Sequence, residues 1–202
     1  RTTVSCLARD FVIQVVGGGL VHLRGLTVAH VGRTPADVLL VTAADVRLDD
    51  VRITGGFTAE QGYAAKGTDR HGRGLVLKRE ASCVARGCRF ERNVRDGVAL
   101  FDDASAALTG GTLAANQDTG ARALGRSHLA LDDVAASANF LAQVVLGEDA
   151  RGVLRATRLT RGGGFGALVM QRARATIRGC AFDENARSGL AVWHEAQPRI
   201  VA

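Results

Sequence analysis

The stretch GLVLKREASCVARGCRFERNVRD (74–96) is followed without a gap by GVALFDDASAALTGGTLAANQDT (97–119), and the two align over their whole length. The same period of 23 residues continues toward the end of the chain. Its first position forms a column of markers: Gly74, Gly97, Gly120, Gln143, Gly166 and Gly189. A fixed period of this length is typical of solenoids, in which each repeat stacks on its neighbours.

Apolar residues recur two positions apart within each repeat, which is the spacing of a β-strand. Leu75 and Leu77 form one such pair, Cys83 and Ala85 a second, and Cys88 with the residue two places later a third. We call these the first, second and third strands. Because one coil cannot bury its own apolar residues, stacked coils must pair like strands in parallel, about 4.8 Å apart. The pattern predicts an all-β, three-sided tube filled by its own side chains.

A second column stands nineteen positions after each marker. Asn and Gly enter the left-handed backbone region most readily, so this column predicts a turn of fixed, left-handed shape with its asparagines in one vertical file. Its members are Asn93, Asn116, Asn139, Gly162 and Asn185.

The repeat resembles the right-handed parallel β-helix repeat family, a group with pectate-lyase-like topology that includes carbohydrate-binding and sugar-hydrolase domains. The resemblance rests on Gly-Leu-Val-Leu (74–77), Gly-Val-Ala-Leu (97–100), Gly-Cys-Arg-Phe-Glu-Arg-Asn (87–93) and Gly-Cys-Ala-Phe-Asp-Glu-Asn (179–185). It implies a right-handed solenoid with three short strands per coil, located outside the cell or on its surface. In enzymes of this family the reacting groups project from the outer side of the first-strand sheet.

A leucine-rich repeat is the alternative, because its period brackets 23 and its consensus also contains an Asn. That repeat needs an apolar residue two places after the Asn. Four of the five positions here do not supply one: Arg95, Asp118, Gly164 and Arg187. The β-helix is therefore favoured.

The whole chain, 1–202, is expected to form a single β-helix domain cut from a longer protein. Residues 1–11 predict an incomplete coil or cap, and 74–202 the regular coils. An earlier coil begins at Asp37, with Val38 and Leu40 facing inward, and lies 37 residues before Gly74 instead of 23. The surplus predicts an inserted loop over 55–73 that overhangs the outer side of the first-strand sheet, where solenoid insertions often bind ligands. A tolerated length variation without a role is the alternative.

The formal net charge of +6 arises from 26 basic and 20 acidic residues. We interpret it as a solvated basic surface, with affinity for an anionic polymer as the alternative. Basic and aromatic residues are not interleaved, so nucleic acid is not an expected partner. No apolar run is long enough for a membrane span, and no secretory leader occurs in the residues given. A polysaccharide or protein partner remains open.

The weak catalytic candidates are Lys66, Arg70 and His71 in the inserted loop, together with Lys78 beside it. They would form a lyase-like basic group. The outer columns of the first strand are otherwise largely apolar. They lack the carboxylate pair of a glycoside hydrolase and the base with cations or metal of a lyase. The expected ligand-binding residues are Tyr63, Lys78, Phe101, Arg122, Met170 and Trp193.

Metals and cofactors are not expected. Asp102, Asp103 and Glu80 suggest a carboxylate or calcium cluster, but Arg126 one coil later is expected to neutralise it. Three of the four cysteines fall at inward positions, where they are small buried hydrophobes. His22, His30 and His128 show no ligand spacing and are expected on the surface or in turns. The sequence thus favours a scaffold or binding module for polysaccharide or cell-envelope components, with a polysaccharide lyase or glycoside hydrolase as the alternative.

Overall fold

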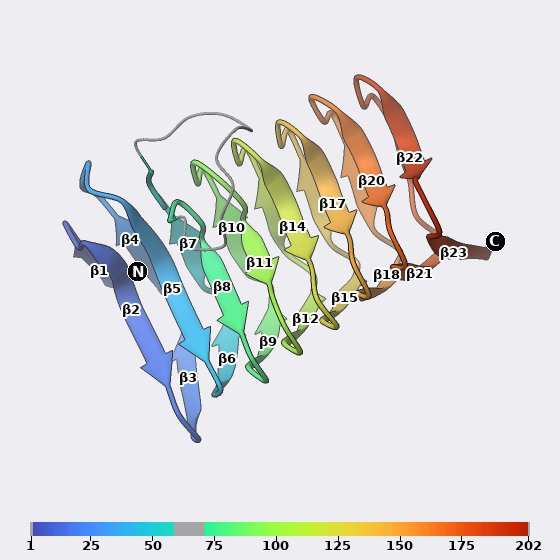
Figure 1. The fold of residues 1–202 in the computed structure, drawn as a ribbon. Coiled ribbons are helices and arrows are strands. Elements are labelled where there is room, and N and C mark those ends of the chain that lie inside the picture. Colours follow the sequence, from blue (N-terminus) through green and yellow to red (C-terminus); the bar gives the residue numbers. More distant parts are fainter. Residues whose placement is uncertain (1, 59–70, 202) are drawn as a thin grey trace.

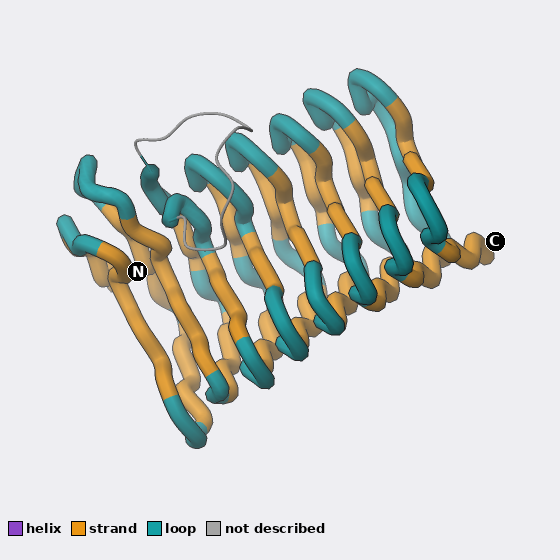
Figure 2. Tube along the Cα trace, viewed as in Figure 1, coloured by secondary structure: helices purple, strands orange, loops and turns teal. Residues whose placement is uncertain are grey.

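A computed structural model describes residues 2–58 and 71–201. The chain winds into a tube whose walls are three parallel sheets, and each coil lies directly on the one before it (Figure 1). Turns and loops occupy the corners between the walls (Figure 2). The described residues contain no helix, which excludes the leucine-rich repeat.

The three sheets correspond to the three predicted strands of the repeat. The first-strand sheet contains β2 (Asp10–Val16), β5 (Ala36–Thr42), β8 (Leu75–Lys78), β11 (Val98–Leu100), β14 (Thr119–Ala123), β17 (Ala142–Leu146), β20 (Phe165–Val169) and β22 (Ser188–Val192). The second-strand sheet contains β3 (Leu20–Arg24), β6 (Asp45–Asp49), β9 (Ser82–Arg86), β12 (Ser105–Thr109), β15 (His128–Asp132), β18 (Arg151–Arg155), β21 (Arg174–Arg178) and β23 (Gln197–Val201). The third-strand sheet contains β1 (Thr2–Cys6), β4 (Leu26–His30), β7 (Arg52–Thr54), β10 (Arg89–Glu91), β13 (Thr112–Ala114), β16 (Ala135–Ser137) and β19 (Arg158–Thr160).

Residues 23 positions apart pair directly across neighbouring coils, as the period predicts. Leu75 pairs with Val98, and Val98 pairs with Ala121. The inward residues of all three walls form one continuous core. Full burial of a leucine side chain stabilises the fold by about 1.5–3 kcal/mol, so positions such as Leu75, Leu100 and Leu129 supply much of the favourable energy.

The asparagines do form the predicted vertical file, but their backbone is not left-handed. The positive φ angles belong to the residues just before them, such as Arg92 at 55° and Ala115 at 55°. Each Asn side chain turns into the tube instead. Asn116 accepts a hydrogen bond from Asn93 Nδ2 at 2.9 Å and donates to Asn139 at 2.8 Å. The column is Asn because a buried amide both donates and accepts along the stack.

One coil breaks the file and compensates for the break. Gly162 stands where an Asn is expected, and Gln143 stands where a marker glycine is expected. The Gln143 side chain accepts the hydrogen bond from Asn139 Nδ2 that the missing amide would have accepted. A Cβ atom added at Gly162 would lie 2.4 Å from Gln143 Nε2. The two departures therefore belong together, because the glutamine fills the space that the glycine leaves.

The first-strand register of the coil at Asp37 is a correction. Leu39 and Val41 pair with inward residues of β8, whereas Leu40 faces outward. The prediction that Leu40 faces inward was therefore wrong by one residue, although Val38 does join the core. A slip of one residue exchanges the two faces of a strand, and this strand is buried on both, so alternation could not reveal its register.

His30 is also corrected, because it is buried rather than at the surface. Its ring nitrogens lie 3.2 Å from the Gly55 carbonyl and 3.0 Å from the Ala8 carbonyl, and so tie two coils together. Cys83 and Cys88 are buried free thiols, as expected of small apolar residues. Burial raises the pKa of both thiols.

The contact between Gln143 and Gly162 predicts that substitutions at these two positions have strongly coupled effects on the free energy of unfolding. Gly162→Asn alone should destabilise the fold through the clash with Gln143. Gln143→Gly alone should do so by removing a buried hydrogen-bond acceptor, and each loss should be about 1–3 kcal/mol. The double variant recreates the pattern of the neighbouring coils and should recover most of this loss. Urea unfolding of the parent, the two single variants and the double variant measures the coupling. Purely additive losses would show that the two positions do not compensate for each other.

Candidate functional site on the outer face of the first-strand sheet

The outer face of the first-strand sheet holds those predicted site residues that the structure describes. Tyr63, Lys66 and Arg70 lie outside the described residues. Lys78 ends β8, and its Nζ lies 6.0 Å from the ring centre of Phe101 in the next coil. The Arg73 guanidinium lies 5.2 Å from the same ring. Lys78 and Phe101 thus come together.

Met170 and Trp193 lie toward the C-terminal end of this face. Trp193 meets the ring of Phe165 edge-on, with the ring centres 5.4 Å apart, and is 44% exposed. Met170 packs against a small apolar cluster that includes Phe165 and Leu168. Most outward apolar residues of this sheet, such as Val145 and Leu168, are buried, so little of the predicted apolar contact surface is exposed. Of the two predicted aromatic residues that the structure describes, Trp193 is exposed and Phe101 is buried.

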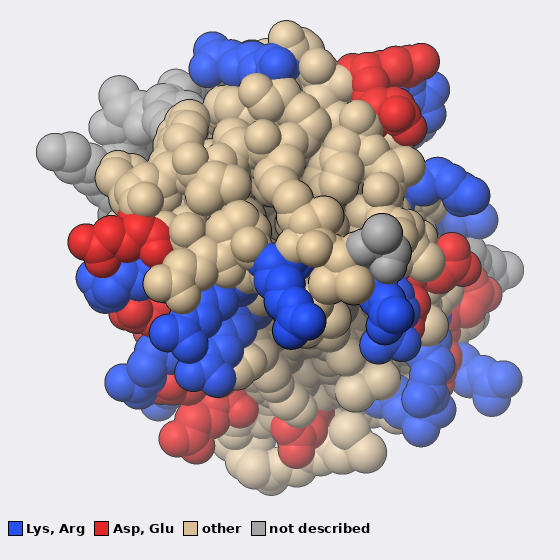
Figure 3. All heavy atoms as spheres, turned by 90° about the vertical axis from the view of Figure 1, so that its right-hand side faces the viewer, with Lys and Arg blue, Asp and Glu red and all other residues tan. Residues whose placement is uncertain are grey.

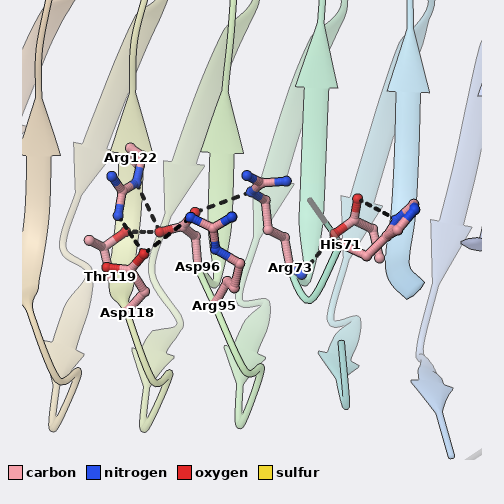
Figure 4. Close-up of polar contacts among 8 residues, drawn as sticks. His71, Arg73, Arg95, Asp96, Asp118, Thr119 and Arg122 are labelled. Carbon is pink, nitrogen blue, oxygen red and sulfur yellow. Dashed lines mark hydrogen bonds and ion pairs between the residues drawn. The ribbon is translucent and has the colours of Figure 1, made fainter. Parts of the chain in front are cut away.

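A row of charged residues runs across several coils where the first strands begin (Figure 4). We call it the polar row. Its members are Asp37, His71, Arg73, Arg95, Asp96, Asp118, Thr119 and Arg122. Most precede the marker by one or two positions, at the corner between the third and first strands.

Asp96 is the centre of the polar row and is fully buried. Arg122 Nε lies 3.0 Å from one carboxylate oxygen and Arg73 Nε lies 3.3 Å from the other, while the Thr119 hydroxyl donates at 2.6 Å. Burial alone would raise the pKa of Asp96, but Arg122, Arg73, Thr119 and Arg95 together lower it. The carboxylate therefore stays ionised at neutral pH.

Asp118 differs from Asp96 in its protonation behaviour. Its Oδ2 lies 2.7 Å from Arg122 Nη2 and 3.7 Å from Arg95 Nη2. Burial and the neighbouring Asp96 charge raise its pKa. Burial lowers the pKa of Arg95, because burial disfavours the charged form of a side chain and the charged form of arginine is the protonated one. Within the described residues, Asp118 Oδ1 and Arg95 Nη1 are buried atoms without a hydrogen-bond partner.

His71 closes the N-terminal end of the polar row. Its Nδ1 lies 3.4 Å from Asp37 Oδ2, and its Nε2 lies 3.4 Å from Asp10 Oδ1. The contact with Asp37 raises the pKa of His71, Asp10 adds to this effect, and burial opposes it. Asp37 also accepts a hydrogen bond from the Arg73 backbone amide at 2.8 Å. Asp37 therefore links His71 to the polar row.

Of the polar row, only His71 and Arg122 were named as candidates from the sequence. The missed residues stand one and two positions before the marker, whereas the candidates within the regular coils stand after it. A signal was present, because Arg73, Asp96 and Thr119 are polar in a column where later coils hold Ala142 and Phe165. That contrast distinguishes the middle coils from the others.

At the next corner, Asp103 and Asp149 pair with arginines, whereas Asp102 accepts a hydrogen bond from the Arg79 backbone amide. Arg126 donates to both oxygens of Asp103 at 2.7 Å, and Arg172 makes the same contact with Asp149. This confirms the predicted neutralisation by Arg126. Over residues 2–58 and 71–201, His, Cys, Asp and Glu side chains form no group suited to a metal ion. The same residues contain no helix with the length and apolar character needed to cross a membrane.

Substitution of Asp96 should be among the most destabilising changes in the chain. Asp96→Asn leaves the guanidinium groups of Arg73 and Arg122 without the carboxylate between them, and breaking a buried ion pair costs about 3–5 kcal/mol. Asp103→Asn, at an exposed ion pair, should change the unfolding free energy little. Urea denaturation compares the two. Equal losses would show that the polar row is not a buried network.

The raised pKa of His71 predicts a pH-dependent contribution to stability. The protonated ring is favoured in the folded state, so its stabilisation is complete below the ordinary histidine pKa and is lost as the pH rises through the raised folded pKa. The stability advantage of the parent over His71→Gln should therefore shrink between about pH 5 and about pH 8. Denaturation across this range, with NMR titration of the ring, measures it. An advantage that grows with pH would contradict the ion pair.

Comparison with known families matches residues 37–201 to a model described as a right-handed β-helix region. No curated protein and no solved structure matches the chain. The match covers most of the chain, including the coils that carry the polar row. The period of 23 residues, the three parallel walls and this match agree. The chain belongs to the right-handed β-helix family.

Proposed function

We propose that this protein is a β-helix binding module that recognises a polysaccharide or another component of the cell envelope, outside the cell or on its surface. The outer face of the first-strand sheet is the binding surface. This proposal is supported by the pectate-lyase-like resemblance of the repeat, which implies reacting groups on the same face. The polar row provides the polar contacts, and Trp193 provides an aromatic surface toward the C-terminal end.

The observation that carries this proposal is the pair of unpartnered atoms in the polar row. Asp118 Oδ1 accepts hydrogen bonds and Arg95 Nη1 donates them, and neither has a partner among the described residues. A buried polar atom without a partner costs about 1–3 kcal/mol, more when it is charged. The two atoms are buried, but their side chains are 18% and 23% exposed, so a small rotation of each side chain would bring these atoms to a ligand on the surface. A sugar hydroxyl both donates and accepts, and so matches this pair.

Trp193 supports a carbohydrate ligand in a second way. Its ring is 44% exposed and is held edge-on by Phe165. Aromatic rings with one open face provide large apolar contact area, and their orientation is fixed by such neighbours. The apolar face of a sugar ring fits this surface. The polar row and Trp193 lie three coils apart, about 14 Å along the tube axis, and at opposite ends of their strands, about 16–20 Å along the strand direction. An oligosaccharide of several residues can bridge this separation.

The alternative function is a polysaccharide lyase or glycoside hydrolase. Asp96 and Asp118 have pKa values shifted in opposite directions, which is the pattern of an acid and base pair. However, both carboxylates bind the same guanidinium, that of Arg122. A substrate would have to displace this arginine to reach both. Binding is therefore favoured over catalysis.

A panel of immobilised neutral and acidic polysaccharides tests the proposal. The parent protein should bind at least one of these polysaccharides. Asp118→Asn should weaken that binding about tenfold or more, because a charged acceptor is lost. Asp103→Asn is the matched control, since it changes a carboxylate outside the polar row, and it should bind like the parent. Unfolding measurements verify that both variants are folded.

Chain cleavage is followed in the same samples by new reducing ends and by unsaturated uronate. If the parent cleaves a polysaccharide and Asp118→Asn does not, the protein is an enzyme and the binding-module proposal is wrong. Failure of the folded parent to bind any polysaccharide, or equal binding by Asp118→Asn and the parent, would reject the proposed surface.

A further inference from the structure

The outer face of the second-strand sheet carries two files of arginines near its C-terminal end. Arg151 pairs in register with Arg174, and Arg155 pairs with Arg178. Successive coils are about 4.8 Å apart, and the two files are separated by four residues along each strand, about 13 Å. Val153 and Thr176 form the exposed floor between them. We call these four arginines the arginine files.

Like charges directly opposite each other in a sheet are destabilising. Elsewhere this chain places opposite charges one coil apart, as in Arg126 with Asp103 and Arg172 with Asp149. In the arginine files, Arg155 has Asp132 at 3.6 Å, whereas Arg151, Arg174 and Arg178 form no ion pair within the described residues. The repulsion is thus left for an external anion to neutralise.

A shallow hollow of about 440 Å³ continues from the arginine files toward the N-terminal end of the same sheet. Its floor consists of small or slender side chains, and one of its borders carries one polar side chain per coil. The floor residues are Val84, Ala107, Ala130 and Val153, and the border residues are Ser82, Ser105, His128 and Arg151. The hollow therefore runs along the tube axis, with the hydroxyl groups of Ser82 and Ser105 at one end and the guanidinium of Arg151, the first member of the arginine files, at the other.

Charge on this sheet is unevenly distributed along the axis. The four C-terminal strands project five arginines, the arginine files and Arg199, against the single acid Asp132. The N-terminal strands carry both signs, with Asp45 and Asp49 beside Arg24, Arg47 and Arg86. From the C-terminal end, basic side chains project around the rim of the tube, with acidic ones among them (Figure 3). The positive potential is thus concentrated where the hollow ends.

We propose that this hollow binds a linear acidic polysaccharide, with the uronate chain along the tube axis and its carboxylates on the arginine files. A sugar residue in such a chain advances by nearly one coil, so hydroxyls and carboxylates meet one polar side chain per coil. Guanidinium groups bind carboxylates with paired hydrogen bonds. The flat floor of Ala130 and Val153 accommodates a sugar ring.

A single-stranded nucleic acid fits this face less well. Such ligands are bound by aromatic side chains on which the bases stack, in addition to basic groups. The outward positions of the described second strands hold no Phe, Tyr or Trp. The site is also separate from the polar row, because it lies on another wall of the tube. The inference therefore goes beyond the proposed function and does not depend on it.

Calorimetric titration with a galacturonate hexamer tests this site. The parent should bind the hexamer, and the variant R151Q/R174Q/R178Q should bind at least about tenfold more weakly, because three charge-assisted contacts are lost. The fully methyl-esterified hexamer, which lacks the carboxylates, should show a similar loss. The melting temperature of the triple variant should equal or exceed that of the parent, since repulsion is removed.

R47Q/R86Q is the matched control, because both arginines lie on the same face outside the arginine files, and it should keep the parent affinity. Equal affinity of parent and triple variant, equal affinity for the esterified hexamer, no binding by the parent, or tighter binding of a thymidylate hexamer would each overturn the proposal.

Discussion

In the regular coils, direct stacking of each residue on the residue 23 positions later is the constraint on which the rest of this structure depends. In a parallel sheet of successive coils, the hydrogen bonds of the sheet join one repeat to the next, so a change of register in one coil would propagate to its neighbours. Like side chains therefore lie above one another along the whole tube. A residue type that recurs at one position of the repeat therefore forms a continuous column, in which each side chain lies next to the equivalent side chain of the following coil.

The columns differ in how they satisfy polar groups. Within the tube, the asparagine file succeeds because an amide donates and accepts at once, so each side chain satisfies the next. A charged side chain cannot repeat in this way. The polar row solves the problem by alternating signs, with Asp96 between Arg73 and Arg122. The arginine files do not alternate, and their repulsion remains on the surface, where an anionic ligand can offset it.

The walls of the tube therefore offer different chemistry on one scaffold. The first-strand sheet presents buried ion pairs and one exposed aromatic ring, whereas the second-strand sheet presents a flat floor bordered by hydroxyl and guanidinium groups. Both surfaces repeat at the coil spacing, which suits ligands that are themselves repetitive. A solenoid can carry such surfaces because its stability derives from the internal columns and leaves the outer positions free to vary.

The sequence alone determined the fold, because period, strand spacing and inward columns are local properties that recur in each repeat. It also predicted the pairing of Arg126 with Asp103, one coil apart at equivalent positions. Only the tertiary structure decided the register at Leu40, where both faces of the strand are buried, and the left-handed residue beside each Asn. It also decided the polar row, because Arg73, Asp96 and Arg122 come from three coils and meet only when those coils stack. Contacts between different columns depend on side-chain direction and burial, and a linear pattern does not contain these.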